Sequence, residues 1–273
     1  DNIMRIDQID ENLSVKSKLE IKGLKYRNVL DSPFDIYGLY QTKKTGEYIR
    51  LPMEVAEEIS PEVCHLGKHT SGGRIRFRTN SPYVAVKIQI QWQSPMPHMP
   101  LTGSNGLDLY VYENGRDVYQ GTFIPPVEMT DSYESVVFFS EKKMHDVTIH
   151  LPLYCGVKTL YIGLDENAEI EKGRSYRQVK PVLYYGSSIT QGGCVSRPGN
   201  NYPAAIARET NVDFVCLGFS GSAKGERRMA EYLAEIDASV FVCDYDYNAP
   251  TVEHLNDTHS YIYECYRKYH PQI

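Results

Sequence analysis

The sequence predicts an α/β protein in which an all-β sandwich of the jelly-roll type precedes a parallel α/β sheet. From about residue 30 to 165, short alternating segments are separated by turn signals, and no convincing long helix is visible. From about residue 180 the pattern becomes strand–helix–strand–helix–strand–helix, which implies parallel βαβ units. We therefore expect an N-terminal accessory β-sandwich domain at 1–172 and a second domain at 173–273.

The strands of the first half are predicted from alternation. Residues 84–92 and 74–78 alternate apolar and polar side chains, so one face of each strand should be buried and the other wet. Further strands are expected at 107–112, 118–123, 147–151 and 159–164. Asn114-Gly115 lies between the first two of these and predicts a tight hairpin, because both residues tolerate the positive φ of a type I′ turn.

The second half predicts three buried strands and three helices. The strands are expected at 182–185, 213–217 and 239–243. The first helix should cover 201–210, with Pro203 in its first turn, and Ser222 is expected to cap the second. The buried faces of the second and third helices are expected to contain Met229, Leu233 and Ile236, and then Ile262, Cys265, Tyr266 and Tyr269.

Composition and charge limit the classes of partner that we expect for this protein. The 273 residues carry a net charge of −6, which argues against a nucleic-acid partner. No apolar run is long enough to span a bilayer, so no membrane partner is expected. The widely spaced cysteines show no metal-binding pattern, and we expect neither a metal nor a cofactor. A reduced, cytoplasmic protein is favoured, but a cleaved signal peptide stays open because the chain does not begin with Met.

Chemically useful residues follow each predicted strand of the second half. Ser188 comes after the first strand, Gly221 after the second and Asn248 after the third. Ligands of open α/β sheets bind at the carboxyl ends of the strands, so these residues should lie near one another. A hydroxyl nucleophile beside N–H and amide donors is the set that acyl transfer requires.

Each of these residues alone has an ordinary structural explanation. A serine after a strand is a favoured helix cap, and Gly221 and Asn248 alone are more often turn residues. Asp244 and Asp246 are candidates for an acid/base pair. The spacing Gly218-x-x-Gly221 suggests dinucleotide binding but lacks the GxGxxG pattern.

The order of these motifs resembles the SGNH/GDSL-type esterase family. Residues 186–192, Gly-Ser-Ser-Ile-Thr-Gln-Gly, resemble block I, with Ser187 where the family usually has Asp. Residues 218–221 resemble block II, and Asn248 resembles the block III asparagine. Residues 106–110, Gly-Leu-Asp-Leu-Tyr, match the GxDLY signature of a β-domain that precedes the hydrolase in one subgroup, and Ser196-Arg197-Pro198-Gly199-Asn200 also fits that subgroup.

The resemblance implies a flavodoxin-like hydrolase domain and a serine ester hydrolase, acting by an acyl-Ser188 intermediate without a cofactor. The N–H groups of Ser188 and Gly221 and the amide of Asn248 would form the oxyanion hole. His98 and Asp246 are candidates for substrate contacts, although a structural role suits His98 as well. The expected substrate is an acetylated carbohydrate or a related small ester.

The family's catalytic base is missing from the pattern. SGNH hydrolases take it from a late Asp-x-x-His block, which this chain does not contain. Asp257-Thr258-His259 has the wrong spacing, and His254 and His270 flank the same predicted helix. We therefore expect the chain to be truncated before that block and to be inactive alone, although its parent would be an esterase.

Two other functions stay open at this point. One is a glycan-binding module with a catalytically incomplete hydrolase domain. The other is an acyltransferase with the same nucleophile, in which a sugar hydroxyl replaces water. The sequence leaves the acyl group, the sugar and the oligomeric state open.

Overall fold

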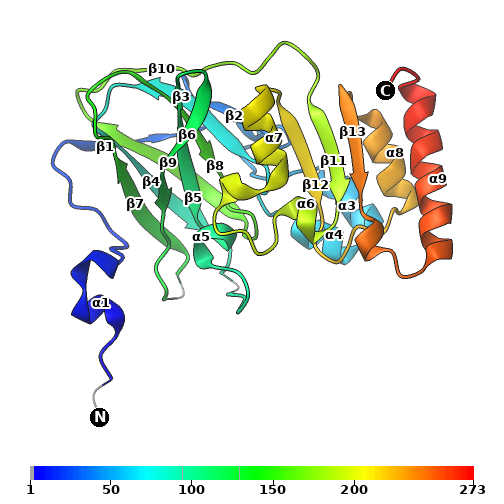
Figure 1. Cartoon of the computed structure of the whole chain (residues 1–273), viewed down its shortest axis with the longest axis horizontal. Helices are drawn as coiled ribbons and strands as arrows, with labels where there is room; N and C mark the ends of the chain where they lie inside the picture. The colour runs from blue at the N-terminus through cyan, green and yellow to red at the C-terminus, as the bar shows by residue number, and fades with distance from the viewer. Residues whose placement is uncertain (1–2, 94, 129) are drawn as a thin grey trace.

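The computed structural model describes residues 3–93, 95–128 and 130–273, in two units that lie side by side (Figure 1). The sandwich unit contains the strands β1 (Leu24–Asn28), β2 (Asp35–Tyr37), β3 (Arg74–Thr79), β4 (Tyr83–Ile90), β5 (Leu107–Glu113), β6 (Arg116–Phe123), β7 (Ser132–Phe138), β8 (His145–His150), β9 (Val157–Asp165) and β10 (Ile170–Lys172). The α/β unit contains β11 (Val182–Gly186), α6 (Ser188–Gln191), η2 (Pro198–Asn200), α7 (Tyr202–Thr210), β12 (Phe214–Gly218), α8 (Arg227–Glu235), β13 (Val240–Asp244), η3 (Asp246–Asn248) and α9 (Val252–Tyr269).

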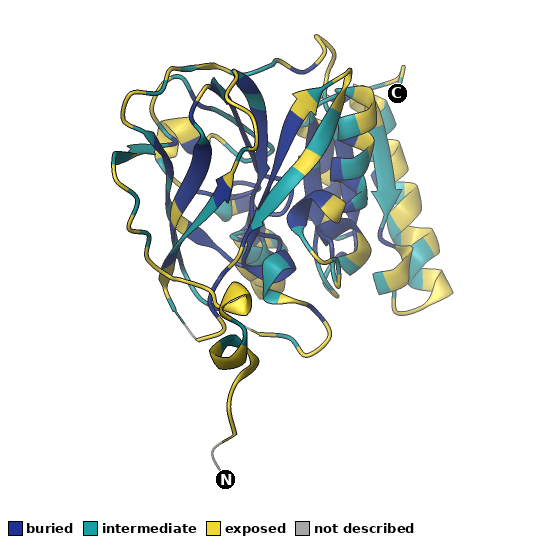
Figure 2. Ribbon diagram, turned by 60° about the vertical axis from the view of Figure 1, so that its left-hand side comes forward, coloured by how far each residue is buried: buried dark blue, intermediate teal, exposed yellow. Residues whose placement is uncertain are grey.

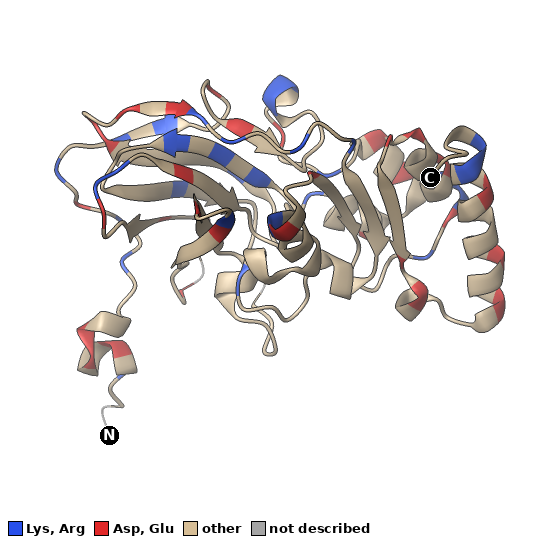
Figure 3. Ribbon diagram, turned by 45° about the horizontal axis from the view of Figure 1, so that its top comes forward, with Lys and Arg blue, Asp and Glu red and all other residues tan. Residues whose placement is uncertain are grey.

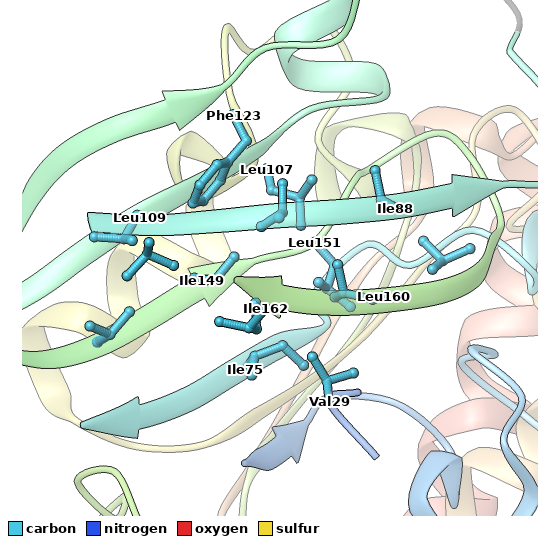
Figure 4. Packing of buried hydrophobic residues seen from close by; sticks show 14 of the residues in the cluster. Val29, Ile75, Ile88, Leu107, Leu109, Phe123, Ile149, Leu151, Leu160 and Ile162 are labelled. Atoms are coloured by element: carbon cyan, nitrogen blue, oxygen red, sulfur yellow. The ribbon is translucent and has the colours of Figure 1, made fainter. Parts of the chain in front are cut away.

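The sandwich unit consists of antiparallel sheets. Among the described residues, one sheet has the order β1-β9-β4-β7, and the other has the order β10-β3-β8-β5-β6 with β2 paired to β3. Alternate side chains of both sheets meet in one core, where Ile88 and Ile162 of the first sheet pack with Leu107, Leu109 and Ile149 of the second (Figure 4). The sandwich predicted from alternating segments is therefore present.

The Asn-Gly hairpin is confirmed. Strands β5 and β6 pair from Leu107↔Phe123 to Glu113↔Arg116. Asn114 has φ 51° and Gly115 has φ 86°, and positive φ at both central residues is the geometry of a type I′ turn.

The first half also contains short helices that the alternation did not predict. They are α1 (Ile6–Ile9), η1 (Glu11–Leu13), α2 (Thr42–Thr45), α3 (Met53–Ile59), α4 (Pro61–Leu66) and α5 (Leu101–Ser104). Ser60 caps α4, since its hydroxyl accepts the Val63 N–H at 3.1 Å. Helices α3 and α4 pack with Leu183 and Leu233 in the core of the α/β unit, so part of the first half covers the second.

The α/β unit is built on a parallel sheet. Within the described chain its order is β12-β11-β13, which is the 2-1-3 order at the start of flavodoxin-like folds. Helix α7 packs on the face that carries Tyr184 and Phe214, whereas α8 and α9 pack on the face that carries Leu183 and Leu217. Buried residues concentrate on β11 and β12 and between the two sandwich sheets (Figure 2). Strand β13 has no fully buried residue, so the prediction of a third buried strand at 239–243 was right about the strand but wrong about its burial.

Helix α8 starts later than predicted. Its N-cap is Glu226, so the expectation that Ser222 caps it was wrong. Gly225 adopts φ +66°, a left-handed conformation that interrupts a helix before Arg227. The Ser222 hydroxyl instead donates to the Ser220 carbonyl at 3.2 Å. In α9 the predicted face is only partly right, because Ile262 and Tyr266 are buried while Tyr269 is exposed.

The expected wet face of β3 is buried against the α/β unit. Arg74 Nη2 donates to Asp213 Oδ1 at 2.7 Å and to the Phe214 carbonyl at 2.8 Å. Arg76 Nε donates to Thr148 Oγ1 at 3.1 Å, and its guanidinium lies 3.5 Å above the Tyr176 ring. Arginines of one unit therefore form part of the contact between the two.

Charges of both signs are interspersed over both units (Figure 3). None of the helices in the described residues is long and apolar enough to cross a membrane.

Candidate active site

The loops that follow β11, β12 and β13 meet at one edge of the parallel sheet. In register, Gly186 lies between Gly218 and Asp244. The Phe219 N–H donates to the Gly186 carbonyl at 2.8 Å, and the Ser187 N–H donates to the Asp244 carbonyl at 3.1 Å. These bonds fix the ends of the three strands, where the three loops begin, relative to one another.

Ser188 stands at the sharp turn from β11 into α6. Ser187 is the N-cap, and its hydroxyl accepts the Ile189 N–H at 3.2 Å. Ser188 is the first residue of α6 and is half-buried; a first-turn N–H has no acceptor within the helix. Glycine is required at position 186, because a Cβ there would lie only 2.0 Å from Thr190 Oγ1. The turn therefore leaves both the hydroxyl and the N–H of Ser188 available.

Asp244 is occupied by contacts within the fold. Its Oδ2 accepts the Thr190 hydroxyl at 3.3 Å and the Tyr202 hydroxyl at 3.2 Å. Asp246, in contrast, is exposed at the start of η3. Asp244 therefore ties block I and Tyr202 to β13, whereas Asp246 faces solvent.

Gly221 presents open backbone. It is exposed and has φ +67°, and a Cβ at this position would meet nothing within 4 Å. A left-handed φ at an exposed position explains why glycine stands here. The loop after β12 is therefore open to solvent at Gly221.

Asn248 closes η3 on the neighbouring loop. Its backbone carbonyl accepts Lys224 Nζ at 2.6 Å, which ties η3 to the segment before α8. Within the described part of the chain, its side-chain Oδ1 is buried and has no hydrogen-bond partner. The Oδ1 atom of Asn248 therefore makes no hydrogen bond within the fold.

His98 is exposed in the turn between Met96 and Met99, which form an isolated bridge. Met99 lies against Gly103, and Gly103 lies against the Val195 carbonyl that follows block I. His98 and Asp246 both reach solvent, and their roles as substrate contacts stay predictions.

The histidines considered as bases are occupied around α9. His254 Nε2 pairs with the Lys224 carbonyl at 2.8 Å, and His270 Nε2 pairs with the Ala234 carbonyl at 2.8 Å. The ring of His259 is stacked with Tyr245, with 6.4 Å between centroids. Among the described residues, no histidine forms a hydrogen bond with Ser188.

An aromatic cluster of the sandwich unit approaches Ser188 through Tyr154, and no sequence motif indicated it. A Cβ on Gly193 would be 3.1 Å from the Tyr154 hydroxyl and 3.6 Å from Ser188 Cβ. The Tyr154 ring lies 5.8 Å from the His69 ring, which lies 5.6 Å from Trp92. Trp92 stacks with the exposed His65 at 4.8 Å. His65 and His69 are four residues apart, but Trp92 and Tyr154 come from distant segments, so no local pattern brings the four side chains together.

The two subgroup motifs contact each other. Asp108, from the GxDLY run, is fully buried and accepts the Gly199 N–H at 2.9 Å. Its Oδ2 lies 3.4 Å from Arg197 Nε. Asp108 therefore anchors the loop after block I to the sandwich unit, which is a structural role.

Two family models match the chain in succession. The GxDLY model, described as the N-terminus of SGNH hydrolase-type esterases, matches residues 24–170. The model of the GDSL-like lipase/acylhydrolase family matches residues 179–273. No curated protein matches.

Solved structures share the fold. A GDSL-like lipase of Bacteroides ovatus ATCC 8483 is 30% identical, with a TM-score of 0.83 over 91% of this chain and 72% of that chain. The salicylyl-acyltransferase SsfX3 of a tetracycline biosynthetic pathway is 20% identical, with a TM-score of 0.72 over 92% of this chain and 71% of its own. A family two carbohydrate esterase from Cellvibrio japonicus is 10% identical, with a TM-score of 0.53 over 91% of this chain and 76% of its own.

Proposed function

The chain belongs to the SGNH/GDSL-type esterase family, and from this premise we propose that it is a serine ester hydrolase with Ser188 as nucleophile. The observation that carries the proposal is the convergence of block I, block II and the η3 loop through the bonds at Gly186. It supports the proposal because the half-buried hydroxyl of Ser188, the exposed Gly221 and the amide of Asn248 follow three neighbouring strands that end at the same sheet edge.

The proposed reaction follows from these groups. Ser188 Oγ attacks the ester carbonyl, and its proton passes to a general base, which returns it to the leaving alcohol. The N–H groups of Ser188 and Gly221 and the side-chain N–H of Asn248 donate to the oxyanion of the tetrahedral intermediate. Water then cleaves the acyl-Ser188 ester, which releases the acid and restores the serine. The base is not assigned to a described histidine.

For the substrate we propose an acetylated carbohydrate. The support is the aromatic cluster Tyr154, His69, Trp92 and His65, which begins at Tyr154 beside Ser188 and continues ring by ring to the exposed His65. Such amphipathic rings present an apolar face together with hydrogen-bonding atoms, and a sugar ring offers both kinds of surface. Exposed His98 and Asp246 are proposed as further contacts at the rim.

The test combines hydrolysis with a binding signal. At the natural length of the protein, release of acetate from 6-O-acetylglucose should be lost in Ser188→Ala. Trp92 is the single tryptophan of the chain, so its fluorescence should change on titration with 6-O-acetylglucose in both the wild type and Ser188→Ala.

Different outcomes of this test would refute different parts of the proposed function. Hydrolysis that survives Ser188→Ala would eliminate the nucleophile. Hydrolysis of p-nitrophenyl acetate without a Trp92 response to the sugar would leave an ester hydrolase and remove the carbohydrate assignment. Acetyl transfer to added glucose in preference to water would point to an acyltransferase.

A further inference from the structure

Gln191 connects block I to the loop that carries Gly221. It is the last residue of α6 and is fully buried. Its Oε1 accepts the Ser220 N–H at 2.9 Å. Its Nε2 donates to the Leu153 carbonyl at 3.1 Å. Because a carbonyl can only accept, this contact fixes which end of the amide is nitrogen.

The same nitrogen of Gln191 contacts His69 Nδ1 at 3.0 Å. Nδ1 must therefore be the acceptor, and the neutral ring carries its proton on Nε2. Burial, with the charge of Arg50 and then His65, lowers the pKa of His69 to about 3. His69 consequently stays neutral and keeps this acceptor across the physiological pH range.

The loop after β12 depends on such anchors. Gly221 is exposed and a Cβ there would meet nothing within 4 Å, so the bonds of its neighbours bear on its position. The bonds at Ser220 and Phe219 hold the loop from the block I side. From the sandwich unit, Arg50 Nη1 also donates to the Gly218 carbonyl at 2.7 Å and to the Cys216 carbonyl at 2.9 Å.

We propose that His69 and Gln191 are positioning residues that couple the sandwich unit to the oxyanion hole: His69 orients the Gln191 amide, which fixes Ser220 and so the N–H of Gly221. The inference rests on the proposed function. It assigns to the sandwich unit a part in positioning the oxyanion hole. Such positioning affects the rate, because misplacing a donor by about 1 Å lowers it by about 100-fold.

Variants of the natural-length protein test the relay. We expect His69→Ala and Gln191→Leu to lower kcat for p-nitrophenyl acetate by about 10- to 100-fold, with KM within about threefold. His69→Asn should restore most of kcat, because its amide oxygen can take the place of Nδ1. His145→Ala is the matched control: His145 is also 4% exposed and stacks on Phe139, so its loss should affect stability but not kcat.

Hydrogen exchange of the Ser220 amide, followed by NMR, gives a readout independent of catalysis. Exchange should accelerate in His69→Ala and Gln191→Leu and should stay slow in His69→Asn and His145→Ala. Unchanged kcat and exchange in His69→Ala would overturn the relay, as would a kcat loss in His145→Ala equal to that in His69→Ala or a failure of His69→Asn to restore. If the wild type hydrolyses no ester, the proposed function fails, while the exchange data still decide whether His69 fixes Ser220.

Discussion

Asp108 illustrates how a signature residue can be found in the sequence while its role cannot. The GxDLY run was recognised, but the partner of Asp108 is the Gly199 N–H in a different motif, 91 positions away. The carboxyl group is 0% exposed. Burial raises the pKa of Asp108 to about 7, against the opposing effects of Gly199, Arg197 and Arg208.

This raised pKa predicts a pH-dependent stability. The native state holds the proton more tightly than the unfolded chain, where the pKa of Asp is about 3.9. The contribution of Asp108 is therefore fully present below about pH 4 and is lost as the pH rises through about 7.

Urea unfolding of the wild type and Asp108→Asn at pH 5 and pH 8 would check this. The wild type should lose stability relative to Asp108→Asn, by at most about 1.4 kcal/mol per pH unit for one proton. An Asn side chain can still accept the Gly199 N–H, so it is a close control. Equal pH profiles of the two proteins would show that Asp108 titrates alike in both states.

The residues proposed for catalysis were easier to nominate from the sequence than the side chains that surround them. Ser188, Gly221 and Asn248 each follow a strand, and the rule for open α/β sheets brings them to one edge. His69, Tyr154 and Arg50 come from another unit, and nothing local in the sequence distinguishes them from ordinary core side chains. Contacts between residues so distant along the chain are set by packing, which a pattern of periods 2 and 3.6 does not encode.

At the scale of elements, β3 shows where alternation misleads. Its side chains alternate as predicted, but the polar face contains Arg74 and Arg76, which are buried. Alternation shows that a strand has two different faces. The polar face can lie against solvent or against another part of the protein. The other environment here is the α/β unit, where Asp213 and the Phe214 ring pair with Arg74.

Substitutions on β3 should distinguish an arginine buried between the units from an exposed one. Arg74→Ala leaves Asp213 and the Phe214 carbonyl without their partner, so we expect a loss on the order of 3–5 kcal/mol in the free energy of unfolding. Arg78→Ala on the same strand is the control, since that side chain is 41% exposed and should change stability by less than about 0.5 kcal/mol. Both are measured by urea denaturation, and equal effects would contradict the buried interface.

Helix boundaries were predicted unevenly. The Asn-Gly turn and the helix with Pro203 in its first turn follow from backbone preferences of single residues. Ser222 is an equally good cap in isolation, yet Gly225 adopts a left-handed φ and delays α8 to Arg227. Local preference permits a helix start, and the tertiary path of the loop after β12 decides it.

At the scale of the whole molecule, the two units are joined near the sheet edge proposed as the active site. Helices α3 and α4 share a core with α8, Ser71 Oγ donates to the Gln191 carbonyl at 2.7 Å, and Asp108 anchors Gly199. The mixed architecture was predictable from the change of period near residue 180. This joining was not, because it depends on helices too short to give a periodic signal.

The central claim is that Ser188 is the nucleophile of an ester hydrolase. The most direct measurement is peptide mapping by mass spectrometry after a fluorophosphonate serine probe reacts with the natural-length protein. We expect one phosphonylated residue, Ser188, and no adduct in Ser188→Ala. An adduct on another serine, or a wild type that hydrolyses esters while Ser188 stays unlabelled, would contradict the claim.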